Sequence, residues 1–147
     1  MKLRTAISLA TLALAATAAS AQQGVTKDEI LLGSIQDLSG PIAGFGKQAR
    51  LGMLLAVDEI NEQGGINGRK IIFKVYDDAS SPTTQVSAAQ QAIQSDKMFG
   101  LTLQSSTVSA FPTLKTANIP VTGFNNQAFN SDRNAFAPTG APPPVGI

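Results

Sequence analysis

The residue types that most often carry out catalysis are missing from this chain of 147 residues, which has neither histidine nor cysteine. Histidine is the commonest general base, and both residue types are frequent metal ligands. Most pairings of a nucleophile with a base are therefore excluded, as are disulfides and cysteine-bound metals. We expect no enzymatic activity, no catalytic residue, no bound metal and no cofactor.

A glycine-rich segment offers one candidate for chemistry. Gly40, Gly44 and Gly46 form a G-x-x-x-G-x-G pattern between an expected strand and an expected helix. In short-chain dehydrogenases such glycines let a pyrophosphate approach a helix N-terminus. Here the strand and the first glycine lie too far apart for a dinucleotide turn. The Tyr-x-x-x-Lys pair of those enzymes is also missing, because Tyr76 is the one tyrosine and no lysine stands four residues after it. The alternative is that the glycines only shape a turn.

Charge gives no sign of a nucleic-acid partner. The chain has 11 Lys and Arg residues against 10 Asp and Glu residues, and its charges are not gathered into runs of one sign. A basic patch or tail is the usual electrostatic signature of nucleic-acid binding. We therefore expect no nucleic acid among the partners.

The amino terminus has the three-part layout of a secretory signal peptide. Lys2 and Arg4 form a basic start, residues 6–16 are apolar, and Ala19-Ser20-Ala21 fits an A-x-A cleavage site. The apolar run is shorter than the about 20 residues that cross a bilayer. We expect cleavage after Ala21 and a periplasmic product. The alternative is an uncleaved anchor.

Strand-like and helix-like segments alternate along the rest of the chain. This βαβαβαβ order predicts an α/β fold with a doubly wound parallel sheet. In such sheets ligands bind outside the carboxyl ends of the strands, so we expect a site in the loops that follow them. The expected strands are 29–35, 71–76, 98–103 and 119–124, the expected helices are 47–63, a helix from Pro82 onward and about 107–117, and the loops are 36–46, 77–82, 104–107 and 125–130.

The helix expected at 47–63 has one clear apolar stripe and ends at a glycine pair, which accepts the left-handed conformation after a last turn. Leu51, Leu54 and Leu55 lie off that stripe. One hypothesis is that another part of the protein covers them. The other is that they form a homodimer contact through this helix.

The end of the chain differs in composition. Residues 138–147 hold four of the eight prolines and carry no charge. We expect three regions: a signal peptide at 1–21, one lobe at 22–137, and a tail or truncation point at 138–147. The lobe is long enough for one domain and too short for two.

Three segments in register resemble the leucine/isoleucine/valine-binding family that serves ABC transporters. They are the loop with Gly40-Pro41 and Gly46, the block AVDEINEQGGINGRKI at 56–71, and DDASSP at 77–82. The resemblance implies the first lobe of a type I periplasmic-binding-protein fold, with the second lobe missing. It also implies capture of an amino acid, or of a related small carboxylate or amide, by closure of two lobes. The implied partner is an inner-membrane ABC permease.

The resemblance places the ligand carboxylate at the loop after the third strand. Ser105 is the best match to the family's serine, with Ser106 and Thr107 beside it. A helix start with unpaired N–H groups would favour an anion there. The alternative is that one of these residues only caps its own helix.

Two further contacts follow from the resemblance. Phe45 stands where the family often has an aromatic residue over the ligand, and its alternative role is packing beneath the loop. The loop after the fourth strand departs from the family's small residues, because it carries Asn125, Asn126 and Gln127. Their extra donors and acceptors favour a solute that is larger or more polar than leucine.

Other functions remain open at this stage. The same fold serves as a ligand-sensing receptor lobe, and the residues do not separate transport from sensing. An exported enzyme or a dinucleotide-binding domain is less well supported, since neither the base nor the tight glycine turn is present.

Overall fold

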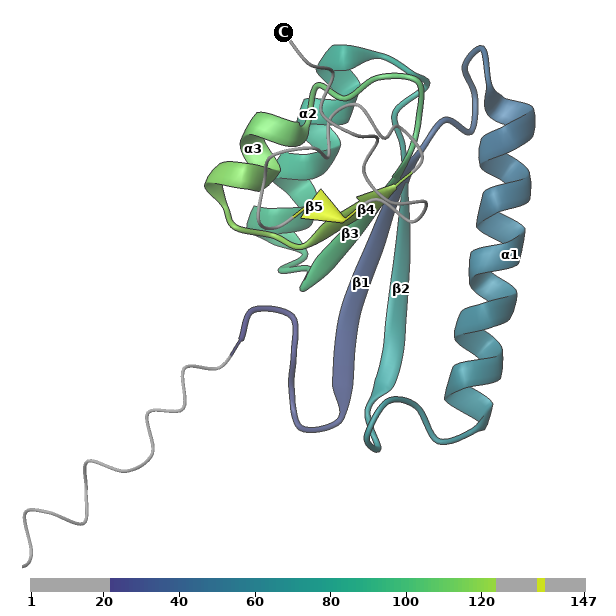
Figure 1. Cartoon of the computed structure of the whole chain (residues 1–147), viewed down its shortest axis with the longest axis vertical. Coiled ribbons are helices and arrows are strands. Elements are labelled where there is room, and N and C mark those ends of the chain that lie inside the picture. The colour runs from purple at the N-terminus through teal and green to yellow at the C-terminus, as the bar shows by residue number, and fades with distance from the viewer. Residues whose placement is uncertain (1–21, 124–134, 137–147) are drawn as a thin grey trace, which may run out of the picture.

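The computed structural model describes residues 22–123 and 135–136. Within them, five strands form one sheet in the order β2-β1-β3-β4-β5, as Figure 1 shows. Every neighbouring pair of strands is parallel, which confirms the predicted fold class. The elements are β1 Glu29–Gln36, α1 Ala43–Glu62, β2 Lys70–Asp77, α2 Pro82–Gln90, the π-helical turn η1 Gln91–Ser95, β3 Gly100–Gln104, α3 Phe111–Thr116, β4 Val121–Gly123 and β5 Ala135–Phe136.

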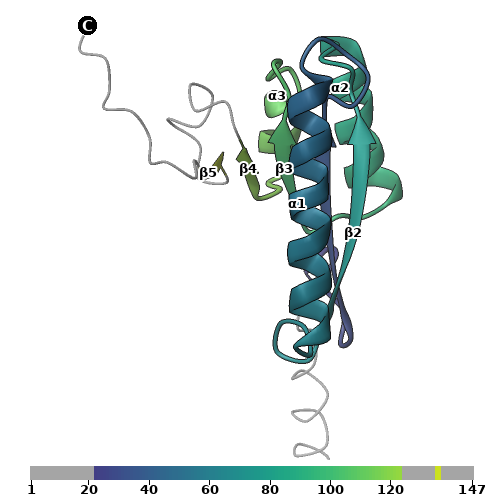
Figure 2. The same cartoon turned by 90° about the vertical axis from the view of Figure 1, so that its right-hand side faces the viewer.

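The helices cover both faces of the sheet. α1 stands alone on one face, while α2 and α3 pack on the other (Figures 1 and 2). β1 lies inside the sheet between β2 and β3. Because all strands run the same way, their carboxyl ends meet at one edge, and the loops leaving β1, β2 and β3 meet there.

The hydrophobic core lies between the sheet and the pair α2 and α3. Alternate residues of the strands point to this face, where small alanines of α2 let the helix approach closely. A fully buried aliphatic side chain contributes roughly 1.5–3 kcal/mol relative to an exposed one. The buried members of this core are Ile35, Tyr76, Ala88, Ala89, Ala92, Met98, Leu101, Leu103, Ala110, Phe111, Leu114, Ile119 and Val121.

The face toward α1 is more polar. Ser34 and Gln36 alternate with the core residues of β1 and are both fully buried. The Gln36 amide nitrogen donates to Ser34 Oγ at 2.8 Å and to Met53 Sδ of α1 at 3.3 Å. Ser34 Oγ in turn donates to the Thr102 carbonyl of β3 at 3.3 Å. These bonds link α1, β1 and β3 beneath the helix.

Two helices begin at other places than the sequence predicted. α1 starts at Ala43 instead of residue 47, so it includes Phe45 and Gly46. α3 starts at Phe111 instead of about residue 107. Proline is tolerated in a first helical turn, because its missing N–H would be unsatisfied there anyway, and Pro112 accordingly lies at the start of α3. The two-residue strand β5 was not predicted, since so short a segment has no pattern.

The end of α1 follows the prediction. Gly64 and Gly65 have positive φ values of 99° and 74°, the left-handed conformation that ends a helix. Asn61, in the last turn, accepts from Ile71 N at 2.7 Å and donates to Ile71 O at 2.9 Å. These two bonds fix the start of β2 against the end of α1.

Candidate functional site

Backbone hydrogen bonds join the loops at the carboxyl edge of the sheet. Asp37 N, just after β1, donates to Gln104 O at the end of β3 at 3.1 Å. Asp78 N, just after β2, donates to Gln36 O at 2.9 Å. The three strand ends therefore form one connected platform rather than three independent loops.

Asp37 shapes the loop between β1 and α1. It is fully buried, and its carboxylate accepts from Gly40 N at 2.5 Å, from Ile42 N at 2.9 Å and from Ser80 Oγ at 2.6 Å. Burial works to raise the pKa of Asp37, but these hydrogen bonds outweigh it, so the pKa lies below its ordinary value. Sequence reasoning missed this residue, although an Asp three residues before a Gly is a typical turn signal.

Asp77 and Asp78 are turn residues. Asp77 accepts from Leu38 N at 2.9 Å and from Ala79 N at 3.0 Å. Asp78 is buried and accepts from Ser80 N at 2.9 Å. Both carboxylates are thus occupied by donors of their own chain.

Gln85 is a buried polar residue of α2 that bonds to the loop after β3, and the sequence analysis did not identify it. Its side chain is fully buried in α2. The amide nitrogen donates to Asp78 Oδ2 at 2.9 Å and to Thr107 O at 2.8 Å, while its oxygen accepts from Ala110 N at 3.0 Å. Gln85 therefore holds the loop after β3 against α2. A glutamine in an amphipathic helix normally predicts a solvent-facing position, which is why no signal marked it.

Ser105 lies at the centre of the loop after β3. It is only 2% exposed, and its Oγ accepts from Thr107 N at 3.3 Å. Within the described residues, no acceptor takes its hydroxyl proton. Ser106 is exposed, and Thr107 Oγ1 shares a 2.8 Å hydrogen bond with Ser109 Oγ. The structure thus brings the three predicted residues together on one loop.

The prediction that Ser105 to Thr107 stand at a helix start is wrong. α3 begins at Phe111 and has only six residues, because Pro112 forces the helix to start beside it. The N–H groups in between are mostly used: Ser109 N donates to Thr107 Oγ1 and Ala110 N to Gln85.

Phe45 also lies at this edge, because α1 begins directly after the loop from β1. Its side chain is 43% exposed, so part of the ring faces solvent rather than the interior. The predicted residues Asn125, Asn126 and Gln127 lie outside the described residues.

The glycine loop is shaped by contacts within the chain. A Cβ on Gly40 would meet the carbonyl of Ala79, and a Cβ on Gly46 would meet the carbonyl of Asp37. The space beside both glycines is therefore filled by the protein's own backbone. This supports the turn-shaping interpretation over the dinucleotide one, which needs that space for a pyrophosphate.

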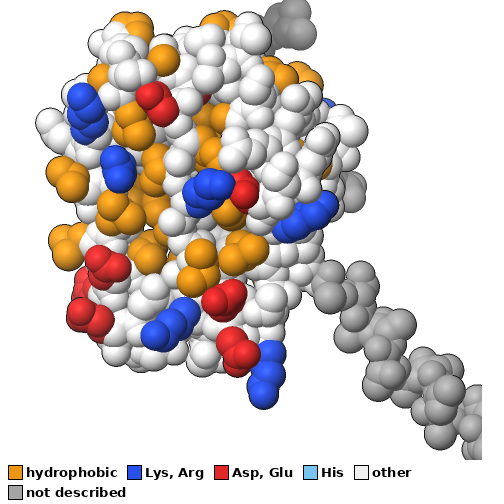
Figure 3. Space-filling model, turned by 180° about the vertical axis from the view of Figure 1, so that it is seen from behind, with side chains coloured by type: hydrophobic (Ala, Val, Ile, Leu, Met, Phe, Trp, Pro, Cys, Tyr) orange, Lys and Arg blue, Asp and Glu red, His pale blue; other side chains and the backbone are white. Residues whose placement is uncertain are grey.

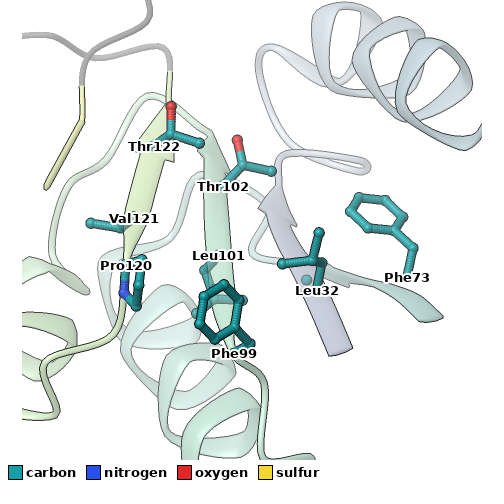
Figure 4. Close-up of a pocket in the computed structure, with 10 residues that line it drawn as sticks. Leu32, Phe73, Phe99, Leu101, Thr102, Pro120, Val121 and Thr122 are labelled. Atoms are coloured by element: carbon teal, nitrogen blue, oxygen red, sulfur yellow. The ribbon is translucent and has the colours of Figure 1, made fainter. Parts of the chain in front are cut away.

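An apolar hollow of about 240 Å³ lies elsewhere, on the sheet face toward α1. Figure 4 shows Leu32, Thr102 and Thr122 from three neighbouring strands around it, with Phe73 and Phe99 at its sides. None of the predicted site residues lines it. Its lining residues stand apart from the loops described above.

The described residues also bear on metal binding and on membrane insertion. There, no three His, Cys, Asp or Glu side chains are grouped so that they could hold a metal ion. None of the helices in residues 22–123 is both long and apolar enough to cross a membrane.

Comparison with known proteins gives consistent matches. A Leu/Ile/Val-binding protein of Rhizobium johnstonii, BraC3, is 39% identical over 87 residues, which cover 59% of this chain and 24% of that protein. A branched-chain amino acid transporter substrate binding protein of Streptococcus pneumoniae, solved with isoleucine, has a TM-score of 0.68 at 24% identity, over 75% of this chain and 33% of that one.

A fatty acid ABC transporter substrate-binding protein of Thermomonospora curvata has a TM-score of 0.68 at 26% identity, over 77% of this chain and 30% of that one. This chain therefore spans about a third or less of the length of these proteins. All three are binding proteins by name, not enzymes. The sequence model of the periplasmic binding protein family matches residues 29–143. That match covers most of the chain, and the chain belongs to the periplasmic binding protein family.

Proposed function

We propose that this chain is the first lobe of the substrate-binding component of an ABC transporter, which captures an amino acid or a related small carboxylate or amide. The observation that carries the proposal is Ser105. Its hydroxyl is buried at the carboxyl edge of the sheet, and its proton has no acceptor among the described residues. A carboxylate is the acceptor that such a donor binds most strongly.

Hydrogen bonds within the chain offset part of the negative charge at the edge where Ser105 lies. Three aspartates lie at the same edge, but the carboxylates of Asp37, Asp77 and Asp78 already accept hydrogen bonds from their own chain. Hydrogen bonds lower the pKa of Asp37 and Asp77 against the effect of burial. Their negative charge is thus partly satisfied before a ligand arrives. The names of the relatives support a ligand with a carboxylate, since branched-chain amino acids and fatty acids share this group.

A second lobe is part of the proposal, because the matched proteins are about three times as long as the region that this chain covers. The second lobe would close over the ligand by a hinge motion. Phe45 would cover the solute from the first lobe, contributing apolar area. Asn125, Asn126 and Gln127 would add polar contacts and favour a solute that is larger or more polar than leucine.

The proposed location is the periplasm, with an inner-membrane ABC permease as partner. The basic, apolar and A-x-A segments of residues 1–21 support export and cleavage after Ala21. The intact mass of the protein recovered from the periplasm checks this. A mass that still includes residues 1–21 would contradict both the cleavage and the release from the membrane.

The test of solute capture is a substitution at Ser105 in the protein with both lobes. Charge-assisted hydrogen bonds contribute roughly 1.5–3 kcal/mol, so Ser105→Ala should weaken binding by about 10- to 100-fold. Thermal-shift screening with amino acids, amides and aromatic acids identifies the solute, and calorimetry then measures its dissociation constant.

The matched control is Ser87→Ala. Ser87 is exposed on α2, and its hydroxyl bonds only to the Thr83 carbonyl of its own helix. Its removal should leave the dissociation constant unchanged. If Ser105→Ala also leaves it unchanged, Ser105 is not a ligand contact. If none of the tested small carboxylates or amides binds, the solute class itself is wrong.

A further inference from the structure

The buried amide of Gln85 connects three segments of the chain. On the face of the molecule seen in Figure 3, basic and acidic side chains occur together without a broad patch of one sign. The Gln85 side chain, by contrast, is fully buried. Its nitrogen donates to Asp78 Oδ2 after β2 and to Thr107 O after β3, and its oxygen accepts from Ala110 N. One side chain of α2 therefore links the ends of two strands.

These three hydrogen bonds fix the direction in which the amide points. A glutamine amide carries two N–H donors on one side and a carbonyl acceptor on the other. The Asp78 carboxylate and Thr107 O are acceptors, whereas Ala110 N is a donor. A reversed amide would place its oxygen against two acceptors and its nitrogen against a donor, so one orientation is satisfied. A buried polar group whose hydrogen bonds are all satisfied is a rigid support.

This support extends from a regular helix to an irregular loop. Gln85 N donates to Ser81 O at 2.9 Å within the first turn of α2, and Ala88 and Ala89 pack the same helix into the core. Residues 105–110 lie between β3 and α3 and belong to neither. Two hydrogen bonds join this loop to α2, and the Gln85 side chain makes both. The position of the loop therefore depends on Gln85.

Thr107 connects Gln85 to Ser105. Thr107 O accepts from the Gln85 amide, while Thr107 N donates to Ser105 Oγ at 3.3 Å. In this second bond a hydroxyl accepts from the backbone N–H two residues further on, as in an ST-turn. The bond is long, so it persists only while Thr107 is held in place from its other side. Gln85 thus influences where Ser105 Oγ lies and in which direction its proton can point.

We propose that Gln85 is a positioning residue of the solute site, which holds the Ser105 hydroxyl in place for the solute carboxylate without touching the solute. The inference rests on the proposed function, in which Ser105 contacts that carboxylate. Ordering a loop or a side chain at the moment of binding reduces affinity. A hydroxyl that Gln85 already holds in place avoids this loss, so the effect of Gln85 on affinity passes through Ser105.

A double-mutant cycle between Gln85 and Ser105 tests this role in the protein with both lobes. The probes are isoleucine, glutamine and benzoate, and calorimetry uses the one that binds most tightly. Gln85→Met keeps the length of the side chain and makes none of the three bonds, so it should raise the dissociation constant about 10-fold. Combined with Ser105→Ala, the same substitution should raise it by less than about 2-fold, because the hydroxyl that Gln85 positions is gone.

A second variant removes one bond and keeps the others, in case Gln85→Met does not fold. Asp78→Asn together with Gln85→Glu exchanges an amide and a carboxylate between two buried positions. The new amide can donate to the new carboxylate and still accept from Ser80 N, and Ala110 N can still donate to position 85. The donor to Thr107 O is lost. At about pH 8, where a carboxyl is ionised, this pair should also raise the dissociation constant about 10-fold.

Two controls separate positioning from stability. Gln90→Met makes the same change at an exposed position of α2, and it should leave the dissociation constant unchanged. Met98→Ala removes a buried side chain from the same core and should lower the stability without touching the loop. At a temperature where circular dichroism shows this variant to be folded, its dissociation constant should also be unchanged.

The cycle distinguishes this inference from the proposed function. A loss of affinity that Gln85→Met causes only while Ser105 is intact supports the positioning role. An equal loss with and without the Ser105 hydroxyl overturns it, since Gln85 then acts on the fold as a whole. An unchanged dissociation constant in a folded Gln85 variant overturns it as well. If Ser105→Ala alone has no effect, or if none of the three probes binds, the proposed function fails and the positioning role fails with it.

Discussion

The two faces of the sheet are built from the same strands but packed in different ways. On the side of α2 and α3, β1 contributes Ile35 to a closed apolar core. On the side of α1, the same strand contributes Leu32, which lines a hollow of about 240 Å³, and the buried polar residues Ser34 and Gln36. Parallel sheets are usually apolar on both faces, because helices cover both.

Because the two faces are packed differently, we expect them to contribute differently to the stability of the fold. Within the described residues, α2 and α3 cover one face of the sheet. The polar residues of this face lie at its margin. The face with α1 has one helix and a row of hydrogen-bonded polar side chains in its middle. We therefore expect the first face to carry most of the folding free energy, and the second to tolerate change.

The strongest test compares two residues of β1 that point to opposite faces. Ile35 is fully buried, so Ile35→Ala should reduce the free energy of unfolding by about 2–5 kcal/mol. Leu32 is only partly buried beside the hollow. Leu32→Ala should therefore reduce the free energy of unfolding by less than about half of the loss caused by Ile35→Ala. Urea denaturation of the mature protein measures both. Equal losses would mean that the hollow is filled in the mature protein and that the two faces are equally packed.

The second test stays within α1 and compares its inner and outer sides. A Cβ on Gly46 would collide with the backbone of Asp37, whereas nothing lies within 4 Å of one on Gly52. Gly46→Ala should therefore destabilise the protein by about 1–3 kcal/mol. Gly52→Ala should stabilise it by roughly 0.5–1 kcal/mol, because alanine favours the helix. Thermal denaturation measures both changes in stability. If Gly46→Ala stabilised the protein, the backbone of Asp37 could not lie as close to Gly46 as the structure shows.

A smaller effect on the free energy of unfolding is expected for polar groups at the margin of the face with α2 and α3. Lys74 Nζ and Tyr76 Oη each lie 2.7 Å from Asp96 Oδ2. The hydrogen bond from Lys74, followed by that from Tyr76, lowers the pKa of Asp96, and burial together with the Asp96 carboxylate raises the pKa of Tyr76. The pKa of Asp96 in the folded protein lies below its unfolded value of about 3.9. The ionised Asp96 therefore stabilises the fold above about pH 4, and this contribution is lost as the pH falls further.

Asp96→Asn tests this cluster by urea denaturation at several pH values. The pair is partly exposed, so the loss at pH 7 should be at most about 1 kcal/mol. The variant should also lose less stability than the unchanged protein between pH 7 and pH 3. Parallel pH profiles of the two proteins would show that Asp96 is not linked to folding.

The smallest expected effect lies in the middle of the α1 face. Gln36 Oε1 is buried without a hydrogen-bond partner among the described residues. Gln36→Met keeps a similar volume and removes this unsatisfied acceptor, so the free energy of unfolding should change by less than about 1 kcal/mol. A loss of several kcal/mol would show that the Gln36 network stabilises the fold after all, and that the two faces are more alike than their packing indicates.

Features that depend on neighbouring residues could be predicted from the sequence. Ser81 caps α2 by accepting from Thr84 N at 3.4 Å, with Pro82 directly after it. The glycine pair ends α1, and the alternation of strands and helices gives the parallel sheet. These signals are local, because a cap, a turn or a run of β-branched residues has the same preference wherever it stands.

Part of the candidate site could be predicted as well. Topology places ligands at the carboxyl ends of parallel strands, and the family resemblance selected Ser105 there. No helix begins directly beside Ser105, because α3 starts late, at Phe111, as a proline inside a weak helical pattern favours.

The tertiary structure alone decided which side of each element is buried. Gln85 and Asp37 are fully buried, although their types predict solvent, because hydrogen-bond partners far along the chain satisfy them. On α2 and the turn after it, Ala88, Ala89 and Ala92 form the core side, while the larger Val86 and Ile93 are only partly covered. Burial depends on which distant segments meet, and a one-dimensional pattern carries that information only where the contacts are local.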